Sequence, residues 1–497
     1  MHPLLASFTL LLSTIGQQPA DVLTAARRAI TVTPEAKQWQ ATALHGTATY
    51  YGEPGSYTLV FAPDGRFMQS VKSDLGESFG CDGTRYWQVD RSGAPRELNF
   101  EDRDMQQAIL MMLTGAWANP PEGVAVSSQA SGFTIKLRSG MEEKVAVDPS
   151  SSLPSVATFE TSAGTITVKM GDWREAGAIK VPFKAEISEG GLTDTFTVTD
   201  ATWTDPPSFA MPQWTPSKIL FDNLKPPSVE SKKAISGHIL VHPLVNGKDV
   251  GWFILDSGAD IMVIDPKVAD DLKLKSVGKL PLVGIGGVVQ EPFRIVDTFQ
   301  MGPATISNIA FAELDLAQIG QYLGVKMAGI VGYDYFRRTI VGVDLETASV
   351  EVYNPLQFQL SSGSWTPMKF SSGNPVVEAK LEGNRSGWFR LDTGANGTVA
   401  FHSPFVVKEQ LLKDRKTSAS GNMGVGGVSE ARTGLIEWFE LAGHRFENPS
   451  ATFSLAKQGA FTDTYLAGNI GQDFMKPFKV LFDFGGSRVA LVPKESK

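Results

Sequence analysis

Cysteine is almost missing from this chain of 497 residues, which contains only Cys81. A single cysteine cannot form a disulfide within the chain, so we expect none. Histidine is also scarce, with six residues. His238 and His242 would share one face of a strand, but no further metal ligands cluster near them in the sequence. We therefore predict no metal site and no cofactor.

Positive charge is not concentrated anywhere in the sequence. The chain has 45 Lys and Arg residues against 53 Asp and Glu residues, which gives a net charge of −8, and it contains no basic cluster. Nucleic acids and anionic membranes select basic surfaces. We therefore expect neither of them to be a partner of this protein.

Long hydrophobic runs are missing as well. The charge-free stretch from Pro3 to Ile15 is too short to cross a bilayer as a helix, but it suits the apolar region of a signal peptide over residues 1–16. A misassigned start or a buried N-terminal helix would explain the same stretch. We expect an exported protein, periplasmic or secreted, with no transmembrane segment.

Glycine and proline, in contrast, are plentiful, with 49 and 29 residues. The chain is 42 % hydrophobic and 20 % charged, a composition typical of a folded protein, and its length predicts more than one domain. Many apolar runs are short and end at turn-forming residues, which favours strands over long helices. We therefore predict a mainly β protein.

One phrase of nine residues occurs twice. Residues 251–259 read GWFILDSGA and residues 387–395 read GWFRLDTGA, so that Asp256 and Asp392 lie 136 positions apart (392 − 256). Each aspartate follows an apolar strand and precedes a Ser/Thr-Gly turn. Two matching half-sites in one chain suggest that a single molecule makes the whole site.

The surroundings of this phrase repeat at nearly the same offset. The matching pairs are LVGIGGV (282–288) with MGVGGVS (423–429), GIVGYDYF (329–336) with GNIGQDFM (468–475), and TIVGVDLETASVEV (339–352) with FKVLFDFGGSRVAL (478–491). Asp265-Pro266 and Ser403-Pro404 each predict the start of a short helix. Landmarks that keep their order and spacing indicate an internal duplication.

With these landmarks, residues 232–495 resemble the retropepsin-like aspartic peptidases. The resemblance implies two tandem β-barrel lobes, over residues 234–356 and 364–495, that pair about a pseudo-twofold axis into a bilobal acid-protease unit. One position departs from the family pattern, because Asn469 stands where an aliphatic residue is usual.

The chemistry of such a site needs two carboxyl groups close enough to share one proton. One carboxylate then takes a proton from water while the other carboxyl protonates the scissile carbonyl. We assign Asp256 and Asp392 to this dyad. Its support residues would be Ser257 and Thr393, whose hydroxyls the resemblance implies tie each turn to the opposite lobe, and Gly258 and Gly394, which permit a close backbone approach.

Alanine follows each of these glycines, at Ala259 and Ala395. A hydroxyl at this position, as in pepsin-type relatives, would hydrogen-bond the carboxylate and favour its ionisation. Without it, we predict a pH optimum that is only mildly acidic.

Two glycine-rich segments are candidate flaps that would fold over a bound peptide, although a plain tight turn would explain the same residues. Their glycines are Gly284, Gly286, Gly287, Gly424, Gly426 and Gly427. Neither segment leads into a helix, as a nucleotide-binding loop must. The resemblance assigns Gly332 and Gly471 to packing beside the dyad loops.

The first part of the chain predicts a separate domain. A helix is expected at 21–30 and another at 101–113, among alternating strands that run to residue 215. The phrases PDGRF, GCDGTRYWQVD and KVPFKAEIS resemble LolA/LppX-type lipoprotein carriers, which implies an antiparallel half-barrel over residues 21–215 with one or two helices. Its concave face would hold an apolar ligand or be closed by a helix. A proline-rich linker is predicted at 216–233.

These observations favour an aspartic endopeptidase that acts on polypeptides as a monomer. A second possibility pairs each lobe with its copy in another molecule. The alternative from another class is a non-catalytic carrier or scaffold, in which the half-barrel binds lipid or peptide and both aspartates are inactive relics.

Overall fold

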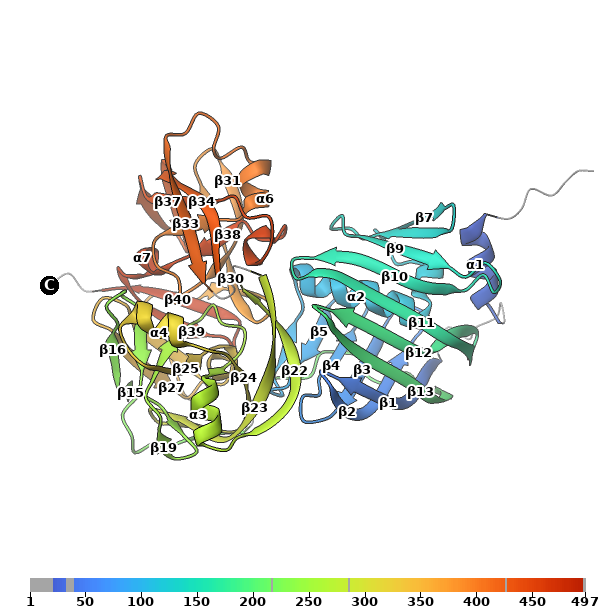
Figure 1. The fold of residues 1–497 in the computed structure, drawn as a ribbon, viewed down its shortest axis with the longest axis horizontal. Coiled ribbons are helices and arrows are strands. Elements are labelled where there is room, and N and C mark those ends of the chain that lie inside the picture. The colour runs from blue at the N-terminus through green and yellow to red at the C-terminus, as the bar shows by residue number, and fades with distance from the viewer. Residues whose placement is uncertain (1–20, 33–39, 216–217, 285–286, 425–426, 495–497) are drawn as a thin grey trace, which may run out of the picture.

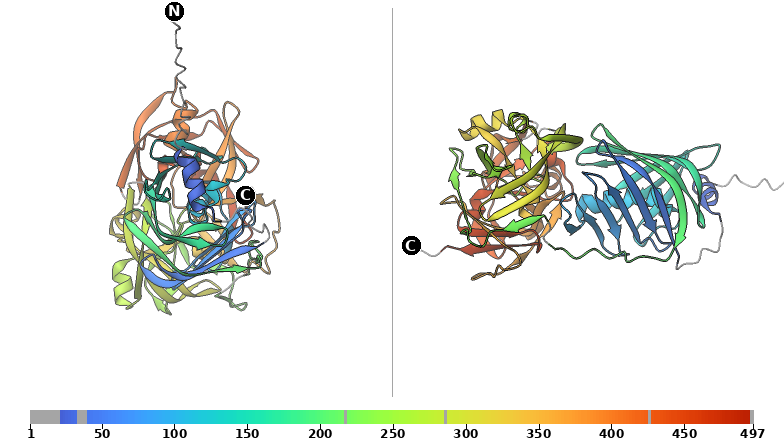
Figure 2. Two further views of the ribbon diagram at one scale, coloured as in Figure 1. Left: turned by 90° about the vertical axis from the view of Figure 1, so that its right-hand side faces the viewer. Right: turned by 90° about the horizontal axis from the view of Figure 1, so that it is seen from below.

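The computed structural model describes residues 21–32, 40–215, 218–284, 287–424 and 427–494. Forty strands and seven α-helices lie in these ranges, which confirms a mainly β protein. Figure 1 and the right-hand view in Figure 2 show two bodies side by side: an N-terminal domain, and a C-terminal unit of two lobes. The predicted signal segment, 1–16, lies outside the described residues.

The N-terminal domain is one antiparallel sheet of 13 strands, in the order β6-β5-β4-β3-β2-β1-β13-β12-β11-β10-β9-β8-β7. Nearly every neighbour in the sheet is also a neighbour in the sequence, as expected for consecutive hairpins. The strands are β1 (Ala41–Tyr50), β2 (Glu53–Phe61), β3 (Phe67–Lys72), β4 (Ser78–Cys81), β5 (Tyr86–Val89), β6 (Pro95–Glu97), β7 (Ala125–Gln129), β8 (Gly132–Lys136), β9 (Glu142–Val147), β10 (Pro154–Thr161), β11 (Gly164–Ala176), β12 (Ile179–Glu189) and β13 (Leu192–Thr204).

Two helices accompany this sheet, both close to where the sequence predicts them: α1 (Val22–Ile30) and α2 (Phe100–Thr114). Asp21 caps α1, because its carboxylate accepts a hydrogen bond of 2.9 Å from the Thr24 N–H. Helix α2 contacts β5 and also β10 and β12, which lie far from β5 in the sheet, so the sheet curls around the helix. Its apolar side chains share one buried cluster with those of the strands, and α2 therefore fills much of the concave face.

The first lobe contains β16 (Ser231–Lys233), β17 (Ile239–Val241), β18 (Leu244–Val245), β19 (Lys248–Asp249), β20 (Trp252–Leu255), β21 (Val263–Ile264), β22 (Lys275–Gly284), β23 (Gly287–Met301), β24 (Ala304–Glu313) and β25 (Met327–Val331). Its helices are α3 (Pro266–Asp271), α4 (Ala317–Leu323) and α5 (Tyr333–Phe336). Helix α3 begins as predicted, with Asp265 as its cap and Pro266 in its first turn.

The second lobe contains β29 (Lys369–Ser371), β30 (Asn374–Leu381), β31 (Arg385–Leu391), β32 (Val399–Phe401), β33 (Thr417–Gly424), β34 (Gly427–Leu435), β35 (Trp438–Leu441), β36 (His444–Glu447), β37 (Ser450–Ser454) and β38 (Gly468–Ile470). Its helices are α6 (Ser403–Lys408) and α7 (Gln472–Met475). Helix α6 starts one residue earlier than the Ser-Pro signal predicts, since His402 is the cap residue.

The two lobes repeat one pattern of strand pairing. In the first, β25 lies parallel to β20 and antiparallel to β21, and in the second, β38 lies parallel to β31 and antiparallel to β32. A shared six-stranded sheet, β15-β27-β26-β39-β40-β28, joins the lobes. Its central strands, β26 (Ile340–Asp344) and β39 (Phe478–Asp483), come from different lobes and pair antiparallel. The sheet therefore fixes the position of the two lobes relative to each other.

The remaining strands of the shared sheet are β15 (Ser228–Val229), β27 (Ser349–Tyr353), β28 (Thr366–Pro367) and β40 (Arg488–Pro493). β15 and a further short strand, β14 (Ile219–Phe221), lie within the predicted linker. β15 pairs with β27 at the edge of the shared sheet, and β14 pairs with β24 of the first lobe, so both belong to sheets of the C-terminal unit.

The N-terminal domain is bound to the C-terminal unit by buried polar contacts. The guanidinium groups of Arg337 and Arg338, just after α5, donate to the carbonyls of Pro95 and Ser92. Both arginines are 2 % exposed. These contacts hold the N-terminal domain against the first lobe.

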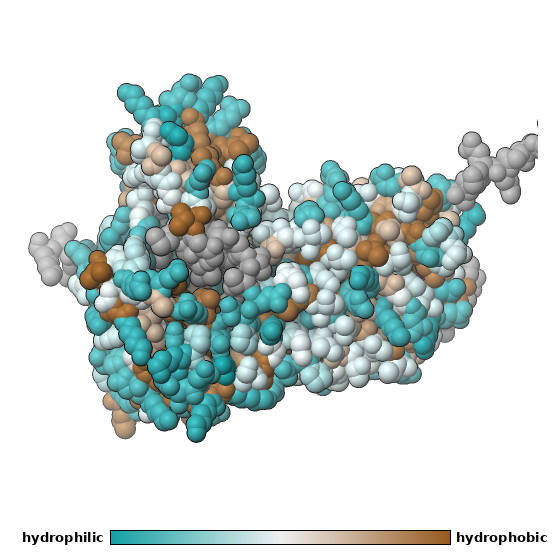
Figure 3. Space-filling view, in the orientation of Figure 1, coloured by the Kyte–Doolittle hydropathy of each residue, from teal (hydrophilic) through white to brown (hydrophobic). Residues whose placement is uncertain are grey.

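The surface mixes polar and apolar residues, and Figure 3 shows brown side chains scattered in small groups on the face it presents. No helix in the described ranges has the length and apolar character needed to span a membrane.

Candidate active site

The two repeated loops meet at the interface between the lobes. β20 leads into Asp256 and β31 leads into Asp392. The Asp256 N–H donates to the Val331 carbonyl and the Asp392 N–H donates to the Ile470 carbonyl, each at 3.0 Å. An equivalent backbone hydrogen bond thus ties each loop to the parallel neighbouring strand of its own lobe, β25 or β38. The two aspartates therefore occupy equivalent positions.

The aspartate side chains lie against the glycines of the opposite loops. A Cβ on Gly258 would lie 2.5 Å from the Asp392 Cγ, and a Cβ on Gly394 would lie 2.5 Å from the Asp256 Cγ. Real Cβ atoms never approach other atoms so closely, so only glycine fits at both places. The Gly258 N–H also donates to Asp256 Oδ1 at 2.8 Å, and the Gly394 N–H to Asp392 Oδ1 at 2.9 Å.

The hydroxyl side chains of Ser257 and Thr393 bind the loops together across the interface. Ser257 Oγ accepts from the Thr393 N–H at 3.0 Å, and Thr393 Oγ1 accepts from the Ser257 N–H at 2.9 Å. The same hydroxyls donate to the carbonyls of Leu391 and Leu255, at 2.8 and 3.0 Å. All four bonds are buried, so they fix the distance between the two loops.

Burial raises the pKa of both aspartates. For Asp256, the second cause is the charge of Asp392, and its pKa lies well above the usual range. For Asp392, the positive charge of Arg390 and a hydrogen bond from Asp256 oppose the effect of burial. Two carboxyl groups this close share one proton, and these surroundings favour that proton on Asp256 and the negative charge on Asp392.

The predicted packing glycines lie beside the loops. A Cβ on Gly332 would lie 2.7 Å from the Ala259 carbonyl oxygen, and a Cβ on Gly471 would lie 2.9 Å from that of Ala395. Neither glycine has space for a side chain, because backbone carbonyls of the dyad loop lie directly against it.

Both candidate flaps are β-hairpins. In the first, Gly284 of β22 faces Gly287 of β23, and in the second, Gly424 of β33 faces Gly427 of β34. The tips at 285–286 and 425–426, which include Gly286 and Gly426, lie outside the described residues. The hairpin form agrees with the sequence, and the role as flaps stays a prediction.

Three residues near the dyad are not part of the predicted site. Gln472 donates to the Thr393 carbonyl at 2.8 Å, and His238 Nε2 lies 2.9 Å from the Gly394 carbonyl oxygen. Burial lowers the pKa of His238. The third is Arg390, which replaces Ile254 of the first copy, a difference that comparing the two phrases could have found.

Asn469, the departure from the family pattern, has a partner. Its Oδ1 lies 3.1 Å from Nε2 of His402, which is fully buried, and burial lowers the pKa of this histidine to about 4. A neutral histidine can donate to the amide oxygen, so the polar pair is accommodated inside the lobe. Within the described residues, no group of three or more His, Cys, Asp or Glu side chains could hold a metal ion.

Solved structures similar to this chain cover different parts of it. Basic 7S globulin from soybean is 9 % identical with a TM-score of 0.34, over 53 % of this chain and 93 % of the globulin. A LolA superfamily protein from Nitrosomonas europaea is 14 % identical with a TM-score of 0.26, over 38 % and 96 %. A retropepsin-like aspartic protease from Rickettsia conorii is 18 % identical with a TM-score of 0.21, over 27 % and 100 %.

No curated protein matches the chain. One family model does match, and it covers the first dyad loop, both strands of the first candidate flap and the glycine behind the loop. Residues 241–335 match the aspartyl protease family, so the chain contains an aspartyl protease domain.

Proposed function

We propose that this protein is an aspartic endopeptidase that hydrolyses peptide bonds with the Asp256–Asp392 dyad. The reciprocal bonds between Ser257 and Thr393 support the proposal most directly, because they join the half-sites of one molecule. This arrangement makes a site within one chain and favours a monomer over pairing with a second copy.

In the proposed reaction, a water molecule lies between the two carboxyl groups. Asp392, as the carboxylate, accepts a proton from this water while its oxygen attacks the scissile carbonyl carbon. Asp256 donates its proton to the carbonyl oxygen, which forms a neutral tetrahedral intermediate. Asp392 then gives its proton to the leaving amine nitrogen while Asp256 takes a proton from one hydroxyl of the intermediate. The C–N bond breaks, the amine and the carboxylic acid leave, and the dyad again holds one proton.

The test is to incubate the purified chain with a diverse peptide pool across pH, with and without a statine-type inhibitor. Asp256→Asn and Asp392→Asn are assayed separately, and each should lower kcat by more than about 1000-fold, because each removes one partner of the proton transfer. Cleavage by either variant at the parent's rate would overturn the proposal. Co-purifying lipid without cleavage would favour the carrier function instead.

A further inference from the structure

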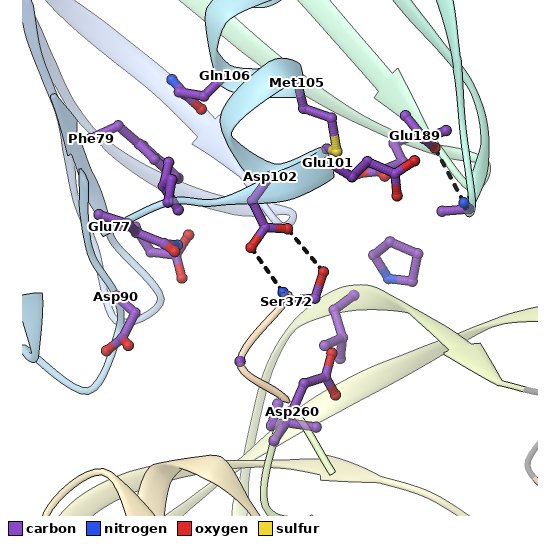
Figure 4. Close-up of a pocket in the computed structure, with 18 of the residues that line it drawn as sticks. Glu77, Phe79, Asp90, Glu101, Asp102, Met105, Gln106, Glu189, Asp260 and Ser372 are labelled. Carbon is purple, nitrogen blue, oxygen red and sulfur yellow. Dashed lines mark hydrogen bonds between the residues drawn. The ribbon is translucent and has the colours of Figure 1, made fainter. Parts of the chain in front are cut away.

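A cavity of about 380 Å³ lies between the N-terminal domain and the two lobes of the C-terminal unit (Figure 4). Gly258 of the dyad loop and Arg390 of the strand before Asp392 form part of its wall. Leu280 and Pro281, from the first strand of the first candidate flap, form another part. The cavity therefore reaches the first dyad loop and the first strand of the first candidate flap.

The N-terminal domain supplies much of the opposite wall, and its contribution is acidic. Figure 4 shows Glu101 and Glu189 facing the same space as Asp260 of the first lobe. Nine acidic side chains and three arginines line the cavity in total. Two of the arginines already have acidic partners: Arg96 lies 3.1 Å from Asp102, and Arg91 lies 3.6 Å from Glu77. The lining therefore keeps an excess of carboxyl groups.

Glu189 and Asp194 stand out because no described cationic side chain pairs with them. Asp194 accepts one hydrogen bond, of 2.8 Å, from the Tyr51 N–H, and Glu189 accepts none from any described residue. Burial raises the pKa of Glu189 to about 7, and the charge of Asp194 adds to this shift. Burial also raises the pKa of Asp194 to about 6, against the lowering effect of the Tyr51 hydrogen bond and with a contribution from the charge of Glu77. Both groups would be stabilised as carboxylates by a cation.

Three buried acceptor atoms in the same lining also lack a donor among the described residues: Asp90 Oδ2, Asp334 Oδ2 and Asn374 Oδ1. Asp334 is 2 % exposed and Asn374 is 6 % exposed, and buried acceptors are nearly always paired in folded proteins. Within the same described ranges, the Nε atoms of the three lining arginines lack an acceptor in turn. A peptide that brings a cationic donor together with its own backbone carbonyls would satisfy both sets.

We propose that this cavity binds a cationic group of the polypeptide substrate while the dyad acts on a neighbouring peptide bond. An ammonium or guanidinium group has only donors and carries the charge that the lining lacks. The N-terminal domain thus forms a specificity subsite of the protease, and its acidic wall suits a cation better than an acyl chain. The inference rests on the proposed function, since the substrate must lie at the dyad.

A lysine or arginine side chain and a free N-terminal amine could each supply this cation. Peptides that carry Lys at successive positions are therefore compared with the same peptides carrying norleucine, each with a free and with an acetylated N-terminus. We expect the parent to prefer the cationic form of one position by about tenfold in kcat/KM. Loss of the preference with norleucine identifies a side chain, and loss on acetylation identifies the N-terminus. No preference at any position overturns the proposal.

The variant that tests the subsite is Glu189→Gln, which removes a charge but no hydrogen bond. The ratio of kcat/KM between the cationic and the neutral peptide should fall by about fivefold. Asp194→Asn is the second variant and should act in the same direction. The matched control is Glu186→Gln, on the same strand β12, since the Glu186 side chain is 52 % exposed and pairs with Lys169. An unchanged ratio in both test variants would refute the subsite.

Binding separates this proposal from the proposed activity. Fluorescence anisotropy with labelled peptides and the Asp256→Asn variant measures affinity without cleavage. If the parent cleaves no peptide but the Asp256→Asn variant binds the cationic peptides more tightly than the neutral ones, the protease activity is refuted and the subsite is kept. Cleavage without any cationic preference in rate or binding would refute the subsite but keep the protease.

Discussion

The first lobe and the second lobe hold their aspartates with matching bonds, yet their surroundings differ. The N–H groups of Tyr333 and Gln472 each donate to the alanine carbonyl of their own loop, at 2.9 Å. Beside the dyad, however, Ile254 of the first lobe corresponds to Arg390 of the second. The duplication has kept the backbone geometry, and the two copies have diverged in the charge that faces the dyad.

The lobes also differ in what covers them. The first candidate flap is bound to the N-terminal domain, because the Lys279 N–H donates to the Tyr51 carbonyl at 2.8 Å and the Gly278 N–H donates to Glu53 at 2.7 Å. No contact of this kind is seen between the described part of the second hairpin and the N-terminal domain. The bilobal unit is therefore symmetric in the bonds that hold its dyad and asymmetric in the contacts that its two candidate flaps make.

In this comparison of the lobes, the largest loss of kcat is expected from variants that disturb the symmetric dyad. Gly258→Ala and Gly394→Ala each place a methyl group where the opposite aspartate lies, so the carboxyl groups must move apart. We expect kcat to fall by about 100-fold or more in both variants, to a similar extent. Steady-state kinetics measures this.

The matched control is Gly171→Ala, at a strand position where a Cβ meets no atom within 4 Å. A much smaller loss in one lobe than in the other would show that the loops are not equivalent.

Next in size is the loss of the bonds across the interface. Ser257→Ala and Thr393→Val each remove two buried hydrogen bonds and leave backbone groups unpaired. Each should lower the free energy of unfolding by about 2–4 kcal/mol. Because all four bonds join the same two loops, loss of one pair should weaken the other, and the double variant should lose less than the sum. Urea unfolding measures both effects. Additive losses would show that the two pairs of bonds act independently.

A smaller effect is expected from Arg390→Ile, which makes the second lobe like the first. The Arg390 charge lowers the pKa of Asp392, so its removal should raise that pKa and shift the acid limb of kcat/KM to higher pH. The pH–rate profile measures the shift, with Arg445→Gln, an exposed arginine of the same lobe, as control. We expect the parent's optimum to be mildly acidic. An acid limb that moves to lower pH would contradict the role of Arg390.

The smallest effect concerns the contact of the N-terminal domain with the second lobe. Ser372 donates through its N–H and Oγ to the Asp102 carboxylate, at 2.8 and 2.9 Å. Ser372→Ala removes the hydroxyl bond and should lower the free energy of unfolding by about 0.5–1.5 kcal/mol. Urea unfolding tests this, and Ser386→Ala, an exposed serine of the same lobe, should change nothing. Equal values for the two variants would show that the contact adds no stability.

The candidate active site could be predicted because it depends on short, local patterns. The DSGA and DTGA loops, the helix start at Asp265 and the glycine behind each loop all reflect backbone demands that a few neighbouring residues satisfy. The mainly β character follows in the same way from short apolar runs and frequent turn residues.

The side-chain contacts around the dyad loops could not be predicted from such local patterns. His238 reaches the Gly394 carbonyl across the lobe interface, and Asn469 meets His402 from a strand 67 positions away. Neither pairing has a local signal. The acidic cavity has no signal in the sequence, since Glu189 and Asp194 lie in one hairpin of the N-terminal domain, Asp334 lies in the first lobe, and the two segments have no motif in common.

The amino-acid sequence alone determined that two equivalent aspartate loops exist, because a duplicated phrase carries the residues that each turn requires. Only the tertiary structure decided that the N-terminal domain lies against the first lobe and encloses an acidic cavity beside the dyad. The physical reason is range: a turn depends on steric limits within a few residues, whereas a cavity wall depends on how distant surfaces pack.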